Sequence, residues 1–153
     1  MHASPPRTPR LDTPARIPPL SLVLGYGPML VILLLGIGAW TLRAPVLADA
    51  ALVWSAAILL FLSGVARGLS FFTEGGPRLT QLATMGLRFG LGVAALALPL
   101  TLAWIALIFG YASLAITEPP AARHGEAPSY FAQLRPIQAL IAVAGLVLCL
   151  LAG

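Results

Sequence analysis

The chain has 153 residues, of which 59% are hydrophobic and only 9% are charged. Soluble domains carry about 25% charged residues, so this composition excludes a water-soluble globular protein and predicts one helical membrane domain. The formal net charge is +4 and all nine basic residues are arginines. They are dispersed along the chain rather than clustered, which argues against a nucleic-acid partner.

The first segment, residues 1–19, is rich in proline and arginine. Proline lacks the backbone donor that a regular helix needs, so we expect a disordered cytoplasmic tail. Four long apolar stretches follow, at Leu20–Leu42, Pro45–Ala66, Leu79–Thr117 and Pro136–Gly153. A transmembrane helix needs about 20 apolar residues. The third stretch has 39 residues and therefore has room for two helices.

Residues 79–117 allow two arrangements. In the first, two short spans turn near Pro99. In the second, an interfacial amphipathic helix up to Arg88 precedes one long span, which gives four spans in all. With the N-terminus inside, the first arrangement places eight arginines inside and only Arg43 outside, whereas the second divides them six to three. The positive-inside rule favours the first arrangement, with an outer C-terminus. Its five spans lie at about 20–42, 46–66, 79–96, 98–117 and 136–153.

The segments between the spans are predicted to be loops. Gly68–Arg78 contains Gly-Gly-Pro, and Glu118–Ser129 is polar and proline-containing. All five acidic residues are assigned to the tail or loops, although Asp49 stands near the start of the second stretch. They are Asp12, Asp49, Glu74, Glu118 and Glu126. We therefore expect no acid inside a span, where proton-coupled transporters usually carry one.

Catalytic and cofactor chemistry finds no support in the sequence. His2 and His124 both lie in polar segments, which argues against haem ligation within the bundle and against a Ser–His intramembrane protease. Cys149 is the only cysteine, so an intrachain disulfide and a cysteine-based metal site are excluded. We expect a buried, inert thiol at Cys149, no enzymatic activity, and neither cofactor nor metal.

Two G-x-x-x-G pairs lie within predicted helices, Gly64–Gly68 and Gly86–Gly90. Glycine lets two membrane helices approach until their backbones touch. We predict that these four glycines pack helices within the chain, with homodimerisation as the alternative.

Arg88 is the one charge expected well inside a span. Gln81 and Thr84 precede it at spacings of three and four, so the three side chains share one helix face. An intramembrane arginine costs at least about 2.5 kcal/mol and usually faces protein or water. With no acid expected in a span, Arg88 should bind an anionic lipid head group or small anion, together with Gln81, Thr84 and Arg67. The alternative is that its side chain snorkels to the inner surface.

Three motifs carry a resemblance to a known family. Leu24–Met29 is similar to an L-G-x-x-G-x-x-P-F opening, Ala57–Gly64 to I-L-S-F-L-G-G, and Tyr130–Arg135 to W-Y-x-x-L-R. In these motifs the chain resembles an uncharacterised membrane family, the domain-of-unknown-function group that includes eukaryotic transmembrane protein 69. It departs at Arg67, where the family has tryptophan, and at Glu118, near which the family has W-D-R-R-like residues. The resemblance implies five spans and a bacterial inner-membrane or mitochondrial setting, but no activity.

The sequence thus predicts a small non-enzymatic membrane protein with a structural, assembly or lipid-interacting role. Its expected partners are membrane lipids, a second copy of the chain or another membrane protein. Its expected location is the bacterial inner (plasma) membrane with the N-terminus cytoplasmic, and the mitochondrial inner membrane is the alternative. The alternative function is a small oligomeric permease or channel whose path is lined by Arg88 or Gln81.

Overall fold

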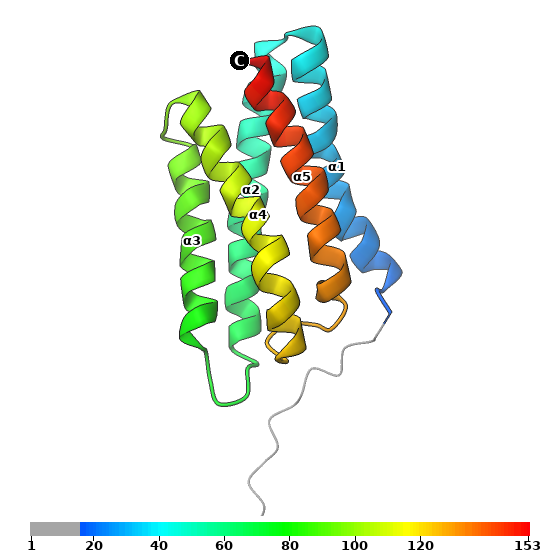
Figure 1. Ribbon diagram of the computed structural model, residues 1–153, viewed down its shortest axis with the longest axis vertical. Coiled ribbons are helices and arrows are strands. Elements are labelled where there is room, and N and C mark those ends of the chain that lie inside the picture. The colour runs from blue at the N-terminus through cyan, green and yellow to red at the C-terminus, as the bar shows by residue number, and fades with distance from the viewer. Residues whose placement is uncertain (1–15) are drawn as a thin grey trace, which may run out of the picture.

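The computed structural model describes residues 16–153, so residues 1–15 of the tail predicted at residues 1–19 lie outside the described residues. The described residues form five α-helices (Figure 1). They are α1 (Pro19–Leu42), α2 (Pro45–Ser70), α3 (Leu79–Ala95), α4 (Leu100–Arg123) and α5 (Phe131–Ala152). The helices run alternately up and down. We call the end that holds residues 71–78 and 124–130 the loop end, and the opposite end, with residues 43–44 and 96–99, the turn end.

The membrane character predicted from composition is confirmed for the described residues. Helices α1, α2, α4 and α5 are each long and apolar enough to cross a membrane. Helix α3 has 17 residues, which is about 25 Å of helix. The chain is therefore an all-helical membrane-type protein with four clear candidate spans and one shorter helix beside them.

The long apolar stretch divides where the first arrangement predicts. Helix α3 ends at Ala95, and Pro99 directly precedes α4. The turn has no polar side chain, but its backbone closes on itself, because Leu98 N donates to Ala94 O at 2.9 Å. In the alternative arrangement the first helix of this stretch ends at Arg88, and that boundary is wrong because α3 continues past Arg88 to Ala95. The number of spans is not decided by this boundary, since four of the described helices meet the length and hydropathy of a span and α3 does not.

Two predicted loop assignments are wrong. Helix α4 continues through Pro119 and Pro120 to Arg123, so Glu118 lies inside a helix. Proline removes the bond to the carbonyl four residues earlier, yet the last turn is still closed, because His124 N donates to Pro120 O at 3.0 Å. Asp49 also lies in a helix, exposed near the start of α2 at the turn end. There its carboxylate can reach water without leaving the helix.

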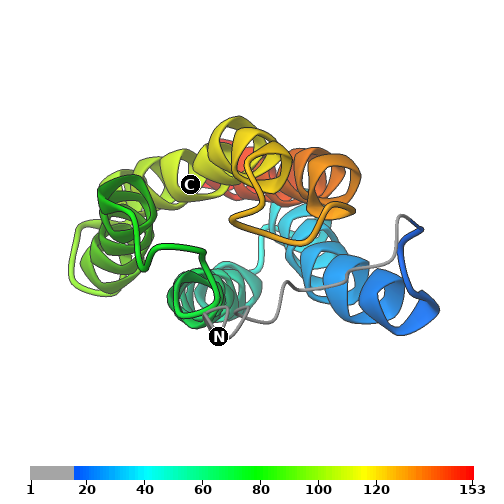
Figure 2. The same cartoon turned by 90° about the horizontal axis from the view of Figure 1, so that it is seen from below.

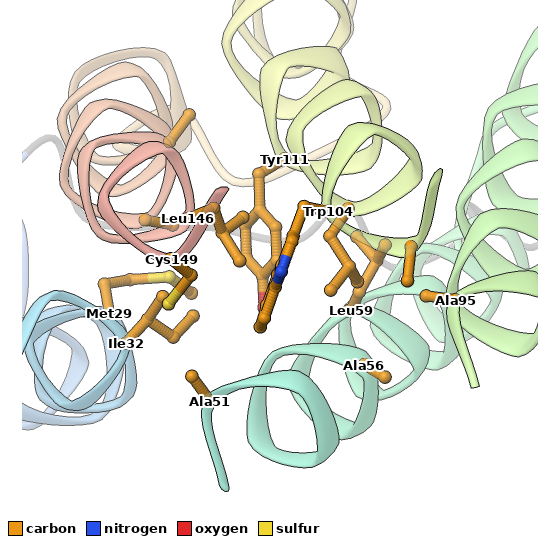
Figure 3. Packing of buried hydrophobic residues seen from close by; sticks show 14 of the residues in the cluster. Met29, Ile32, Ala51, Ala56, Leu59, Ala95, Trp104, Tyr111, Leu146 and Cys149 are labelled. Carbon is orange, nitrogen blue, oxygen red and sulfur yellow. The ribbon is translucent and has the colours of Figure 1, made fainter. Parts of the chain in front are cut away.

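The five helices form a closed bundle. In order around it, α1 packs on α5, α5 on α4, α4 on α3, α3 on α2, and α2 again on α1. Figure 2 shows α3, α4 and α5 along one side of the bundle, with α1 and α2 along the other. The core contains Trp104 and Tyr111 side by side (Figure 3). The Tyr111 hydroxyl donates to Ser55 O on α2 at 2.8 Å. Cys149 is buried beside this core, as predicted.

Glycine packs helices in this bundle, but at positions that the sequence did not single out. A Cβ on Gly145 of α5 would lie 2.7 Å from Ile32 O on α1, and one on Gly36 would collide with the Gly145 backbone. At Gly64, Gly68, Gly86 and Gly90 a Cβ would meet no atom within 4 Å. The prediction that these four glycines pack helices within the chain is therefore wrong.

For Gly64 the reason is which face of α2 is turned toward α3. Ser63, not Gly64, faces α3, where its hydroxyl donates to Met85 O at 2.9 Å. Gly64 consequently points away from the bundle.

Candidate functional site

A partly open pocket of about 670 Å³ lies at the loop end, between the end of α2, the start of α3 and the end of α4. This volume is typical of a site for a small organic ligand. Its apolar wall comprises Ala66, Leu69, Leu79, Ile116, Ala121 and Ala127. Its polar lining includes Arg78, Thr84, Glu118, His124 and Glu126.

The opening of the pocket has apolar edges. Leu79 on α3 is 81% exposed and Ile116 on α4 is 72% exposed, and both line the pocket. Large aliphatic side chains that are this exposed at the lips of a cavity are unfavourable in water and favourable in hydrocarbon. The pocket lining thus includes aliphatic side chains of α3 and α4 that are largely exposed.

An ion pair closes the inner wall of the pocket. Arg88 Nη1 on α3 lies 2.5 Å from Glu118 Oε1 on α4, and the Arg88 side chain is only 1% exposed. Arg88 Nε donates to Ser113 Oγ at 3.0 Å, and Nη2 donates to Thr117 Oγ1 at 2.5 Å. The Thr117 hydroxyl in turn donates to Ser113 O at 2.8 Å. Each guanidinium nitrogen thus has a partner on α4, which compensates the cost of burying the charge.

A second ion pair stands at the rim. Arg78 Nη1, just before α3, lies 2.5 Å from Glu126 Oε1 in the loop after α4. The Arg78 side chain is 50% exposed, whereas Glu126 is mostly buried. This pair joins the two loops that frame the pocket. The Arg78 side chain remains half exposed.

Gln81 fixes the start of α3. Its Oε1 accepts a hydrogen bond from Arg78 N at 3.0 Å, and its Nε2 donates to Thr73 Oγ1 at 2.8 Å. The first bond satisfies a backbone donor at the helix N-terminus. Gln81 therefore serves α3 and the preceding loop rather than Arg88.

The structure brings together only some of the residues that the sequence groups around Arg88. Gln81 and Thr84 both line the pocket, but neither has a hydrogen bond to Arg88 among the described residues. Arg67 lies apart, with its guanidinium 4.1 Å from the centre of the Phe71 ring and its Nη1 donating to Ser70 Oγ at 2.8 Å. The expectation that Arg88 lacks a carboxylate partner is wrong, because Glu118 supplies one.

Sequence reasoning missed Glu118 and Glu126. The Pro-Pro pair after Glu118 is typical of a helix end, so the sequence predicts a loop at Glu118. One signal could have found it. Ser113 and Thr117 are four residues apart and share a helix face, and Glu118 follows directly. A polar face in an apolar helix indicates a buried polar partner, and Arg88 is the candidate.

Arg135 on α5 is a second buried arginine near this wall. Its guanidinium lies 4.1 Å from the centre of the Phe131 ring, and Nη1 donates to Gln138 Oε1 at 3.0 Å. Glu118 attracts it and Arg88 repels it through space. Its Nε is buried with no hydrogen-bond partner among the described residues. Arg135 and Arg88 are both buried and neither lines the pocket, so Arg78 is the arginine of the described residues that a ligand in the pocket can contact.

The remaining chemistry of the site is limited. Within residues 16–153 there is no group of three or more His, Cys, Asp and Glu side chains that could hold a metal ion. His124 is exposed, and its Nδ1 lies 2.8 Å from Pro120 O. The pocket and its surroundings thus combine an apolar wall, two ion pairs and several hydroxyls.

Comparisons of the chain with known protein families, with curated proteins and with solved structures find no match.

Proposed function

We propose that this chain is a five-span, non-enzymatic protein of the bacterial inner membrane whose pocket at the loop end binds a phospholipid. The observation that carries the proposal is the pocket itself, which combines an apolar wall and an exposed aliphatic opening with charged groups at one end. A phospholipid likewise combines apolar acyl chains with a charged head group, whereas most soluble metabolites have no long apolar part.

The orientation follows from the arginines. Arg16, Arg67, Arg78 and Arg123 belong to the loop end, and Arg43 belongs to the turn end. Because cytoplasmic segments of membrane proteins are enriched in Arg and Lys, the loop end faces the cytoplasm. The pocket then lies at the depth of inner-leaflet head groups.

Helix α3 is the shortest of the five helices, and its packing against its neighbours supports counting it as a span. Its 17 residues equal the lower end of the usual range for a transmembrane helix. It packs against both α2 and α4 and lies alongside them in Figure 1. A helix held between two spanning helices shares their direction through the bilayer, so the C-terminus lies outside.

Reporter fusions test this topology. Alkaline phosphatase fused to Gly153 should be active, and green fluorescent protein fused there should be dark. The same reporters inserted after Gly125, in the loop after α4, should behave in the opposite way. A fluorescent fusion at Gly153 without phosphatase activity would contradict five spans.

A matched pair of tryptophan variants tests lipid binding. Ala121→Trp places a large ring inside the pocket, whereas Ala144→Trp places the same ring on an exposed position of α5. Native mass spectrometry of the protein released from membrane nanodiscs should show retained phospholipid in the wild type and in Ala144→Trp. Ala121→Trp should lose it. Equal retention in both variants would show that the lipid binds elsewhere or not at all.

The oligomeric permease or channel has less support. Arg88 is buried and bonded to α4, and Gln81 is engaged by Thr73 and Arg78. Neither side chain is placed to line a path. The resemblance to the family that includes eukaryotic transmembrane protein 69 stays a prediction, since the comparisons give it no support.

A further inference from the structure

The charges of the pocket define which head group it can accept. Arg78 contributes one positive charge to the lining, and Glu118 and Glu126 contribute two negative charges. Arg88 neutralises Glu118 from behind and is itself enclosed. What faces a ligand is therefore the rim pair of one guanidinium and one carboxylate, Arg78 and Glu126.

This rim pair does not suit an anionic head group. A phosphoglycerol or phosphoserine group would meet Arg78, but its negative charge would also lie against the Glu126 carboxylate. Like charges at such short range are unfavourable. The anionic lipid expected from Arg88 alone is therefore disfavoured by the charges that the fold assembles around it.

A zwitterionic head group fits both members of the pair. Its phosphate can accept hydrogen bonds from the Arg78 guanidinium, which matches phosphate oxygens in geometry. Its ammonium can donate to Glu126. The ligand phosphate would replace Glu126 as the partner of Arg78, and the ligand ammonium would replace Arg78 as the partner of Glu126. No charge is then left unpaired. Because the Arg78 side chain is 50% exposed, a ligand phosphate can reach its guanidinium and replace the Glu126 carboxylate as its partner.

The lining also discriminates between kinds of ammonium. Quaternary ammonium groups are recognised by aromatic rings that surround them. Among the described residues that line the pocket there is no Phe, Tyr or Trp. A primary ammonium, by contrast, has three N–H donors, and the pocket offers acceptors in Glu126, Thr80 and Thr84.

From this geometry we infer that the pocket selects a phospholipid with a phosphoethanolamine head group. The phosphate binds Arg78, the ammonium binds Glu126, and the acyl chains leave between Leu79 and Ile116. The inference rests on the proposed lipid-binding function and adds the class of lipid. The lipid then takes the place of the direct ion pair as the link between the two loops.

Competition in mixed nanodiscs tests the class. The full chain is placed in equal amounts of phosphatidylethanolamine, phosphatidylglycerol and phosphatidylcholine of identical acyl chains, and the retained lipid is identified by native mass spectrometry. We expect the ethanolamine lipid to be retained about tenfold over each of the others, which corresponds to about 1.4 kcal/mol. Preference for phosphatidylglycerol, or equal retention of the choline lipid, would overturn the inference.

Two glutamate variants locate the selectivity. Glu126→Gln removes the carboxylate that should bind the ammonium, and the preference for the ethanolamine lipid should fall about tenfold. Glu74→Gln is the matched control, since Glu74 is an exposed acid in the loop before α3 that does not line the pocket. It should leave the preference unchanged. If Glu126→Gln keeps the full preference, or if Glu74→Gln loses it equally, the assignment of Glu126 is wrong.

A third arm separates the lipid from its soluble head group. Glycerophosphoethanolamine has the same charges without acyl chains, and at equal concentration it should not displace the lipid. If it does, the apolar wall contributes nothing and the site is one for a soluble ligand. Failure of the lipid class is also distinct from failure of lipid binding. In the first case Ala121→Trp still removes lipid without selectivity, and in the second it changes nothing.

Discussion

Two ion pairs join α3 and the residue before it to the end of α4 and the loop after it. Their carboxylate side chains are equally buried, at 10% exposure, and the pairs differ in the burial of their arginines. Arg88–Glu118 lies behind the pocket, and Arg88 is bonded to Ser113 and Thr117 as well. Arg78–Glu126 lies at the rim, with half of the arginine side chain exposed. The Arg88 guanidinium is enclosed and has a partner at each nitrogen, whereas a ligand or solvent can replace Glu126 as the partner of the half-exposed Arg78. Burial therefore separates a fixed structural element from an exchangeable one.

The strongest test of this comparison is Arg88→Leu. The variant leaves the Glu118 carboxylate enclosed without its cation, and removing one member of a buried pair typically costs about 3–5 kcal/mol. We expect a loss of that order in the free energy of unfolding, measured by denaturant titration in detergent micelles.

The control for this variant is Arg88→Leu combined with Glu118→Leu. No charge of the pair is then left in the wall, so much of the lost stability should return. If the double variant is less stable than the single one, the hydrogen bonds to Ser113 and Thr117 stabilise the bundle more than the charges do. If Arg88→Leu alone unfolds like the wild type, the pair is not structural.

How far the sequence predicts this fold depends on the kind of contact. The apolar stretches and Pro99 placed the helices and the turn between α3 and α4, since these depend on local composition. The position of Arg88 also predicted a polar environment. The identity of its partner could not be derived in the same way, because Glu118 is followed by two prolines that locally favour a loop. Its place in α4 is held by contacts with α3 instead.

The glycines illustrate the same limit. Gly64 and Gly86 belong to motifs that are typical of helix contact, but which face of a helix meets its neighbour depends on the whole bundle. The contact between α1 and α5 instead uses Gly36 and Gly145, one from each helix, which no local pattern pairs. Gln81 was grouped with Arg88 by helix spacing, but its side-chain hydrogen bonds are made to Arg78 N and Thr73 and hold the start of α3.

Enclosed and exposed positions can also be compared for packing, by substituting one glycine of each kind. Gly145→Ala would place a methyl group 2.7 Å from the Ile32 carbonyl oxygen of α1. Overpacking of this kind typically costs about 1–3 kcal/mol, and we expect a lower melting temperature in detergent.

Gly86→Ala is the matched control, because nothing lies within 4 Å of its added Cβ. Replacing an exposed helical glycine by alanine should stabilise the helix by about 0.5–1 kcal/mol. The two substitutions are thus expected to have opposite signs. A loss of stability in Gly86→Ala, together with a shift from dimer to monomer in light scattering, would instead support the homodimer interface.

The smallest effect on stability is expected at the rim. Arg78→Gln breaks the rim pair. Because the arginine of this pair is half exposed, we expect a smaller loss of stability than in Arg88→Leu, and the loss should shrink further as salt is added. The same variant removes the cation that binds phosphate in the proposed site, so total phospholipid retention should fall although the melting temperature hardly changes. Arg123→Gln is a suitable control, since Arg123 is an exposed arginine at the same end that does not line the pocket. If Arg78→Gln destabilises the protein as much as Arg88→Leu does, the two pairs are equivalent and burial does not separate their roles. If it alters neither stability nor retention, the rim pair has no part in binding.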